Sequence, residues 1–237
     1  SNLTIFWGCG TNLRRTPYNA RNHEYYSEDA VLTSGQAVAF ISGGKEYGVI
    51  IAPKHLAFND TEINRTGVSV FMTEQQAREN ELRGTQASIE DAGALGIMTA
   101  FNRVGITAAN AHTGLLKNIL RGEWGFRGMV ITDGFHFTDY MDSDIAIRNG
   151  CDLMLKNYDV ATNHLTDTTS ATSVKAMRQA CKNIMYTVVN SRVYDPANTV
   201  STPIWRTAMI VVDVLLAVLL VVLEVLTFKS YKKKKAQ

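Results

Sequence analysis

The sequence predicts an α/β domain built on a parallel sheet, followed by a single membrane-spanning helix. Two observations predict the domain. Short β-branched or apolar runs alternate with helix-like stretches over residues 1–195, and polar side chains follow directly after these runs. This alternation is typical of βαβ units and a parallel sheet. The third observation is a predominantly apolar run of 21 residues at positions 208–228, which predicts the helix.

The alternation defines five strands and five helices. The strands are expected at residues 4–7, 48–53, 96–101, 128–132 and 152–155. The helices are expected at residues 30–41, 74–92, 113–123, 138–149 and 173–190. A β/α barrel and an open doubly wound sheet both place function at the carboxyl ends of their strands, so this pattern leaves the two open. Five strands are too few for a closed barrel of about eight. We therefore expect an incomplete barrel, or a domain that includes residues before Ser1.

The apolar run has the length and the flanks of a transmembrane helix. As a helix, 21 residues span about 32 Å, close to the hydrocarbon thickness of a bilayer. Trp205 and Arg206 precede the run, and Tyr231 and the lysines at 232–235 follow it. Because lysine-rich flanks stay in the cytoplasm, we expect a cytoplasmic C-terminus and an extracellular body on a single-pass cell-membrane protein. The expected segments are a linker at 196–206, the span at 207–228 and a basic tail at 229–237.

Two acidic residues, Asp213 and Glu224, interrupt the apolar run. Each costs a few kcal/mol if it is charged near the middle of the bilayer. They are eleven residues apart and so share one helix face. Protonation of Asp213, or a partner helix on that face, would lower its energetic cost in the bilayer. The alternative is an amphipathic helix that packs on the body or lies on the membrane surface. Apolar residues surround the whole circumference, which favours a span.

Composition excludes several classes of protein. With 46% hydrophobic and 19% charged residues among 237, the chain is not a disordered polyelectrolyte. Three cysteines are too few and too scattered for a disulfide framework or a zinc site, and we expect neither a metal nor a cofactor. The net charge of +2 arises in the basic tail, and the body has slightly more acidic than basic residues. We therefore expect no nucleic-acid partner.

Four blocks in the body resemble, in order, the signature of glycoside hydrolase family 3. The first covers residues 12–17 and 20–29, which read NLRRTP and ARNHEYYSED. The second, KHL at 54–56 with ND at 59–60 and EINR at 62–65, is similar to the family's Lys-His-Phe block. The third runs over residues 115–133 and ends in GMVITD, and the fourth is NGCDLML at 149–155. The resemblance covers about residues 4–190, and four ordered blocks are far more specific than one.

The resemblance implies a partial (β/α)8 barrel and retaining hydrolysis of β-linked glycosides, above all β-glucosides. Asp133 falls on the family's nucleophile. It ends an apolar and β-branched run and is followed by glycine, which would expose its carboxylate at the pocket floor. Without the resemblance, a strand-end aspartate is better explained as the cap of the next helix. A cationic neighbour would keep Asp133 ionised, as a nucleophile requires.

The resemblance also implies four substrate-binding residues. Lys54 and His55 fall on the pair that grips the sugar in the cleavage subsite, and Arg21 falls on another sugar-contacting arginine. Phe101 stands where the family usually has a tyrosine whose hydroxyl supports the nucleophile. The expected partner is therefore an oligosaccharide or other glycoside. Three further charged residues are interpreted as scaffold ion pairs: Glu24, Glu62 and Arg65.

A retaining glycosidase needs a second carboxyl group about 5 Å from the nucleophile, as general acid and base. In the β-glucosidase-like members this group is a glutamate on a separate α/β sandwich domain. We see no alternative Asp-His dyad after His55. A barrel followed directly by a membrane helix suggests the family's permuted order, with the sandwich first. We therefore expect the N-terminal domain or domains of the same gene product to precede this chain.

Two rival functions remain open. A non-catalytic, membrane-anchored carbohydrate-binding protein on the same barrel would explain Phe101 and the missing acid/base. A barrel aldolase or dehydrogenase would need a Schiff-base lysine or a phosphate loop. Lys54 is available as the lysine, but no glycine-rich phosphate site accompanies it.

Overall fold

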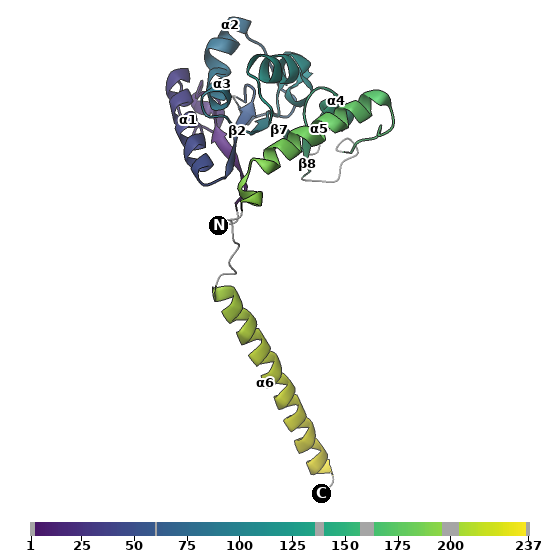
Figure 1. The fold of residues 1–237 in the computed structure, drawn as a ribbon. Coiled ribbons are helices and arrows are strands. Elements are labelled where there is room, and N and C mark those ends of the chain that lie inside the picture. Colours follow the sequence, from purple (N-terminus) through teal and green to yellow (C-terminus); the bar gives the residue numbers. More distant parts are fainter. Residues whose placement is uncertain (1–2, 60, 136–139, 157–163, 196–203, 236–237) are drawn as a thin grey trace. The chain divides into compact units, whose positions relative to one another are not determined.

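The computed structural model describes residues 3–59, 61–135, 140–156, 164–195 and 204–235. The chain divides into two compact units, Ser1–Asp195 and Pro196–Gln237, and each is described by itself. Figure 1 shows the first unit as a sheet with surrounding helices and the second as one long helix.

The first unit is built on five parallel strands in the order β1-β2-β4-β7-β8. The strands are β1 (Ile5–Gly10), β2 (Ile50–Leu56), β4 (Gly96–Thr99), β7 (Met129–Phe135) and β8 (Leu153–Lys156). In register, Phe6 lies opposite Ile51, Lys54 opposite Met98, and Ile131 opposite both Met98 and Leu153.

Each large strand pairs with the next large strand along the chain, so the sheet has no point at which its order reverses. A doubly wound sheet has such a switch point, whereas the wall of a β/α barrel has a sequential order. Right-handed crossovers between sequential parallel strands place their helices on one face. The first unit is therefore a TIM-like wall of five strands. Within the described sheet, β1 and β8 form the two open edges.

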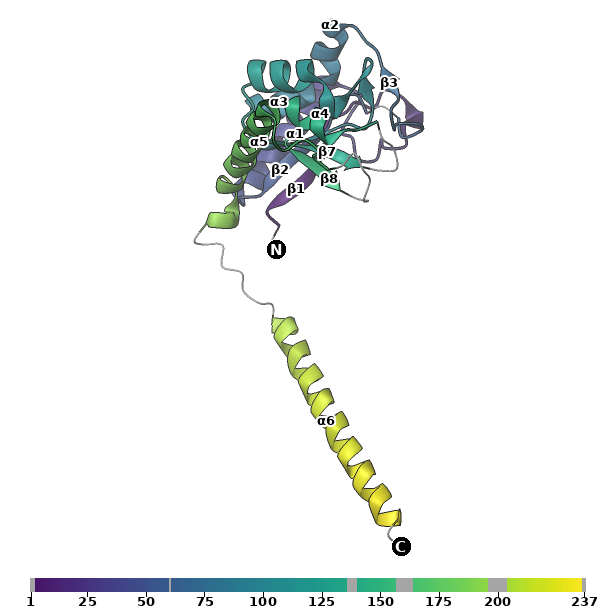
Figure 2. The ribbon, with the colours of Figure 1, turned by 90° about the vertical axis from the view of Figure 1, so that its right-hand side faces the viewer.

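Helices α1, α3 and α5 pack against this group of strands (Figure 2). The longer helices are α1 (Ala30–Glu46), α3 (Arg83–Glu90), the π-helical η4 (Gly114–Glu123), α4 (Ser143–Arg148) and α5 (Ala171–Val189). Short helical turns are η1 (Pro17–Asn19), α2 (Glu74–Gln76), η2 (Ala77–Glu81), η3 (Ala109–Ala111) and η6 (Arg192–Tyr194). The buried contact between sheet and helices is made by aliphatic side chains such as Ile97, Val130, Leu116 and Leu120.

Three predicted helices have different bounds in the structure. The expected helix at 74–92 is divided into α2, a π-helical turn and α3, and the π turn places the carboxylate of Glu81 inside, 3.1 Å from Arg15. Helix α1 continues five residues beyond position 41. A Cβ on Gly44 would lie 2.4 Å from Ile51, so that glycine permits close packing on β2 and does not end the helix. Helix α4 begins at Ser143 with Asp142 as its cap, and residues 138–139 of the expected helix lie outside the described residues.

Three two-residue strands form a second sheet that the sequence did not predict. They are β3 (Ser69–Val70), β5 (Arg103–Val104) and β6 (Thr107–Ala108). Two residues carry no recognisable alternation of apolar and polar side chains, so pattern analysis does not detect such strands.

A buried ion pair joins four elements on the helical side of the sheet. Asp152, just before β8, accepts hydrogen bonds from Arg121 of η4 and from the Val130 amide of β7, each at 2.7 Å. Asn183 of α5 donates a third at 2.8 Å. Burial raises the pKa of Asp152 to about 6 against the opposing charge of Arg121, so the carboxylate is ionised at neutral pH.

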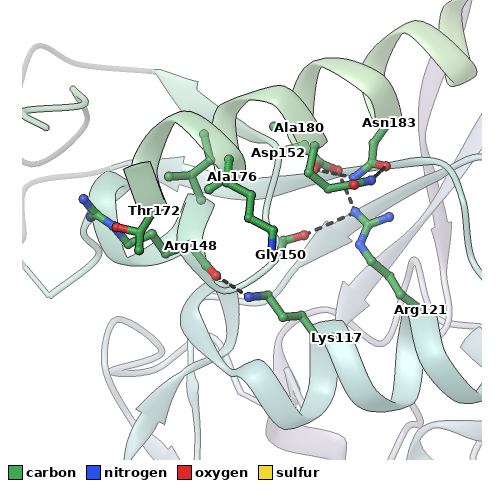
Figure 3. A pocket seen from close by; sticks show the side chains of 12 residues that line it. Lys117, Arg121, Arg148, Gly150, Asp152, Thr172, Ala176, Ala180 and Asn183 are labelled. Carbon is green, nitrogen blue, oxygen red and sulfur yellow. Dashed lines mark hydrogen bonds and ion pairs between the residues drawn. The ribbon is translucent and has the colours of Figure 1, made fainter. Parts of the chain in front are cut away.

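Arg121 and Asp152 lie at the base of a pocket of about 530 Å³, with α5 as one wall and η4 as the other (Figure 3). Lys117, Arg148 and Lys175 are the other cations that line it, and the first two have partners among the described residues. Lys117 donates to the carbonyl of Arg148, and the Arg148 guanidinium pairs with Asp167. The pocket contains none of the predicted site residues. We interpret the paired charges of Arg121, Asp152, Lys117 and Arg148 as contacts that hold the helices together.

Replacing Asp152 with alanine should destabilise the first unit by about 3–5 kcal/mol, because Arg121 would be left buried without its counter-charge. The measurement is the urea midpoint or the melting temperature of the chain. The matched control is Glu123→Gln, which removes one partner of the exposed pair with Arg78 and should change the melting temperature little. Equal effects of the two variants would contradict this account of the buried pair.

The second unit contains α6 (Ile204–Lys235), a helix of 32 residues. Within the described residues, Ile204–Lys232 is the one helix that is long and apolar enough to cross a membrane by length and composition. It begins three residues before the expected start of the span. Most of the expected linker lies outside the described residues.

Candidate active site

Asp133 lies in the C-terminal half of β7, and its side chain is 15% exposed. The backbone amide of Gly134 donates to its Oδ1 at 2.7 Å. The other oxygen, Oδ2, faces two cationic or donor groups: His55 Nε2 at 3.5 Å and Arg65 Nη1 at 3.9 Å. One carboxylate oxygen thus accepts a hydrogen bond from the backbone, and the other faces side chains from β2 and from the loop after β2.

His55 is fixed by its backbone. The side chain of Asn12, after β1, accepts from the His55 amide at 2.9 Å and donates to the His55 carbonyl at 3.0 Å. The imidazole is 2% exposed. Burial, followed by the nearby charges of Arg21, Lys54 and Arg65, lowers the pKa of His55 well below its usual value. The ring is therefore neutral, and its contact with Asp133 is that of a dipolar group with a carboxylate.

Arg21 and Lys54 meet at Glu24. Arg21 comes from the loop after β1; its Nε donates to Glu24, and its Nη1 lies 3.2 Å from His55 Nε2. Lys54, on β2, places its Nζ 3.2 Å from Glu24 Oε2. Burial raises the pKa of Glu24, but its contacts with Arg21 and Lys54 outweigh burial and leave that pKa below its usual value. Glu24 is therefore a charged anchor for two of the predicted sugar-binding cations.

Glu62 connects Arg21 to Arg65. Both guanidinium groups approach Glu62 Oε1 at 3.2 Å, which agrees with the interpretation of Glu24, Glu62 and Arg65 as ion-pair partners. Arg65 does more than the sequence indicated, because it also faces Asp133 and lies over the ring of Phe101, 4.3 Å from the centroid. The sequence feature that could have indicated this role is the position of Arg65 in the Lys-His…Asn-Arg block.

Phe101 is 1% exposed and lies beneath Arg65, so its ring contacts side chains of the site. The hydroxyl of Tyr140 donates to the Phe101 carbonyl. Burial, together with the nearby Asp133 charge, raises the pKa of Tyr140, so the phenol keeps its proton. Tyr140 was not predicted from the sequence to be part of the site. No local pattern marks it, because what brings it here is its position after β7 in three dimensions.

The structure thus brings Asp133, His55, Arg21, Lys54 and Phe101 to the C-terminal end of the sheet. Burial is the largest influence on the pKa of Asp133 and raises it, while the Gly134 amide and the charges of Arg65, Arg21 and Lys54 oppose the rise. From the sequence, only the lowering of the Asp133 pKa by a neighbouring cation was expected. Among the described residues, no three His, Cys, Asp or Glu side chains gather as metal ligands.

Replacing Arg65 with methionine should raise the pKa of Asp133 further, because it removes one of the charges that stabilise the carboxylate. If ionised Asp133 is required for turnover, activity is lost as pH falls through its pKa. The acidic limb of kcat/KM should therefore move to higher pH in this variant. Arg78→Met, at an exposed pair outside the site, is the control and should leave the limb in place. An unchanged limb, or one at lower pH, in the Arg65 variant would count against Asp133 as the titrating group.

Solved structures with a similar fold include β-glucosidases. "Beta-glucosidase 3B from Thermotoga neapolitana in complex with glucose" matches with a TM-score of 0.70 and 26% identity, over 80% of this chain and 27% of that one. "Beta-glucosidase from Kluyveromyces marxianus in complex with glucose" matches with a TM-score of 0.70 and 27% identity, over 79% of this chain and 23% of that one.

Curated proteins with similar sequences are also named β-glucosidases. A "probable beta-glucosidase J" of Aspergillus fumigatus is 38% identical over 149 residues, 63% of this chain and 17% of the relative. A β-glucosidase of Bacteroides ovatus is 38% identical over 162 residues, 68% of this chain and 21% of the relative. The chain therefore spans about a fifth of the length of these relatives. The model of the "Glycosyl hydrolase family 3 N terminal domain" matches residues 3–193. With four ordered sequence blocks, a TIM-like wall and this match over most of its length, the chain belongs to glycosyl hydrolase family 3.

Proposed function

We propose that this chain carries the nucleophile of a retaining, membrane-anchored glycosidase that acts on β-glucosides. The observation that carries the proposal is the placement of Asp133 in the C-terminal half of β7, with His55 at 3.5 Å and Arg65 at 3.9 Å from one oxygen. Family membership and the β-glucosidase relatives support the reaction class. In the proposed reaction, the Asp133 carboxylate attacks the anomeric carbon as the glycosidic bond breaks, and water later hydrolyses the glycosyl-enzyme.

The cations around Asp133 suit recognition of sugar hydroxyls. Lys54 and Arg21 are 18% and 14% exposed, so each can reach a ligand while Glu24 holds it in place. His55 is nearly buried and neutral, which suits a short hydrogen bond to a single hydroxyl beside Asp133. Arg65 and the Gly134 amide hold and charge-stabilise the nucleophile.

We propose that the acid/base comes from a domain outside this chain. The lowered pKa of Glu24 makes it a poor proton donor near neutral pH. Glu62 is occupied by both Arg21 and Arg65. The chain spans about a fifth of its relatives, which is consistent with the expected N-terminal domain of the same gene product.

We also propose that α6 anchors the enzyme as a single span, with the body outside the cell and the basic tail in the cytoplasm. The support is the uninterrupted helix over Ile204–Lys235 and the lysines after its apolar part. An extracellular body fits a glycoside that is too polar to enter the cell unaided.

The test is hydrolysis of an aryl β-glucoside by the intact gene product, with the first-formed sugar identified by NMR. A retaining enzyme releases β-glucose before mutarotation, whereas an inverting enzyme releases α-glucose. Residues 1–203 alone should turn over this substrate very poorly, because the acid/base is absent. Glucose binding without any turnover by the intact product would instead identify a carbohydrate-binding protein. Full-rate turnover by residues 1–203 would refute the external acid/base.

A further inference from the structure

A polar stripe runs along α6, and its interpretation rests on the proposal that this helix spans the membrane. Asp213 and Glu224 are eleven residues apart, which in a helix is about 20° from exact alignment. Continuing with alternating steps of four and three residues gives one face of the helix, composed of Arg206, Ile210, Asp213, Ala217, Leu220, Glu224, Thr227 and Tyr231. We call these residues the α6 stripe.

Between residues 208 and 228, the stripe differs in chemistry from the rest of the helix, which is wholly apolar there. It carries both acidic residues of α6, the one alanine between them and a threonine hydroxyl. Positions 214–216 and 218–219, which lie off the stripe, are all Val or Leu. All members of the stripe are exposed. A shallow hollow follows the same face and is lined in part by Leu220, Glu224 and Thr227. In lipid, this face would present carboxylates to acyl chains, which is the arrangement that a membrane disfavours most.

The spacing of the stripe is that of a helix-packing seam. Steps of three and four residues keep one face turned toward a partner helix. Ala217 lies between the two acidic levels, and a small residue there allows two helix backbones to approach closely. Polar groups inside transmembrane helices characteristically face a partner and not the lipid.

Charge decides between the candidate partners. A second, parallel copy of this chain would place Asp213 against Asp213 and Glu224 against Glu224, which brings like charges together in a medium of low dielectric. A helix with a basic side chain level with Asp213 would instead neutralise it. We propose that the α6 stripe docks the transmembrane helix of another protein, one that carries Lys or Arg at the depth of Asp213.

The test uses the full chain in phosphatidylcholine vesicles and measures energy transfer to synthetic leucine-alanine helices. One host helix carries a single Lys at the depth of Asp213, and the matched host carries Leu there. The wild-type chain should bind the lysine host about tenfold more tightly than the leucine host. Asp213→Leu should abolish the preference, and Ala217→Ile should reduce it. Leu215→Asn, about 200° around the helix from Asp213, is the control and should preserve it.

Two results would overturn the stripe as a docking surface. One is equal binding of the two hosts. The other is stronger transfer between labelled copies of the chain than to the lysine host, which would indicate self-association. A carbonate wash before the measurement separates this inference from the membrane proposal. Loss of the chain in the carbonate wash would contradict both the membrane span and the docking surface. Retention of the chain with equal binding of the two hosts would contradict the docking surface alone.

Discussion

Replacing Asp133 with asparagine should lower kcat for an aryl β-glucoside by a factor on the order of 10⁴ or more in the intact gene product. The amide keeps the shape of the side chain and can still accept the Gly134 hydrogen bond, but it loses the charge that attacks the anomeric carbon. The measurement is steady-state kinetics, with glucose binding by calorimetry to show that the site is intact.

Asp142→Asn is the matched control for this substitution. Asp142 caps α4 by accepting a hydrogen bond from the Ile145 amide, and asparagine caps helices equally well. We expect near wild-type kcat in the control. If Asp133→Asn retained more than about a tenth of the activity while binding glucose normally, Asp133 would not be the nucleophile.

Truncation after residue 203 should move the body from the membrane fraction to the soluble fraction almost completely. The reason is the apolar surface of α6, where the side chains from Ile204 to Phe228 are exposed along the whole helix. The measurement is fractionation of expressing cells with a carbonate wash. Truncation after Lys235 removes two residues beyond the helix and serves as the control, which should stay with the membrane.

Orientation is tested on the same cells. Protease added outside should digest the body and spare a small C-terminal fragment, because in the proposed topology the lysines at 232–235 hold that end in the cytoplasm. Release of the full-length chain by carbonate would show that α6 does not span the membrane. Protection of the body from external protease would show the opposite orientation.

Strand and helix positions could be predicted from the sequence because hydrophobic periodicity is a local property. The five large strands appear within a few residues of their expected positions, although β2 continues through Lys54 to Leu56 and β7 continues through Asp133 to Phe135. The roles expected of Asp133 and Lys54 came from the resemblance to family 3 and not from strand position alone. The choice between a barrel wall and a doubly wound sheet could not be made locally. It depends on which strands pair, and the sequential order β1-β2-β4-β7-β8 is a property of the folded chain.

The charged network could be predicted only in outline. Glu24, Glu62 and Arg65 were expected to form ion pairs, but the contact of Arg65 with Asp133 joins a loop after β2 to the end of β7. Tyr140 reaches the Phe101 carbonyl across 39 residues of chain. The pKa of Asp133 depends on burial as well as on charge, and no sequence pattern reports how much water a fold removes from one carboxylate.

The most direct test of the central claim is to trap the glycosyl-enzyme. Incubating the intact gene product with a 2-deoxy-2-fluoro-β-glucoside that carries a good leaving group should add one fluoroglucosyl group per chain, because the fluorine slows breakdown of the intermediate more than its formation. Peptide mass spectrometry should then find the sugar on Asp133, and the Asp133→Asn protein should stay unlabelled. Labelling of a different carboxylate, or equal labelling of the asparagine variant, would contradict the account.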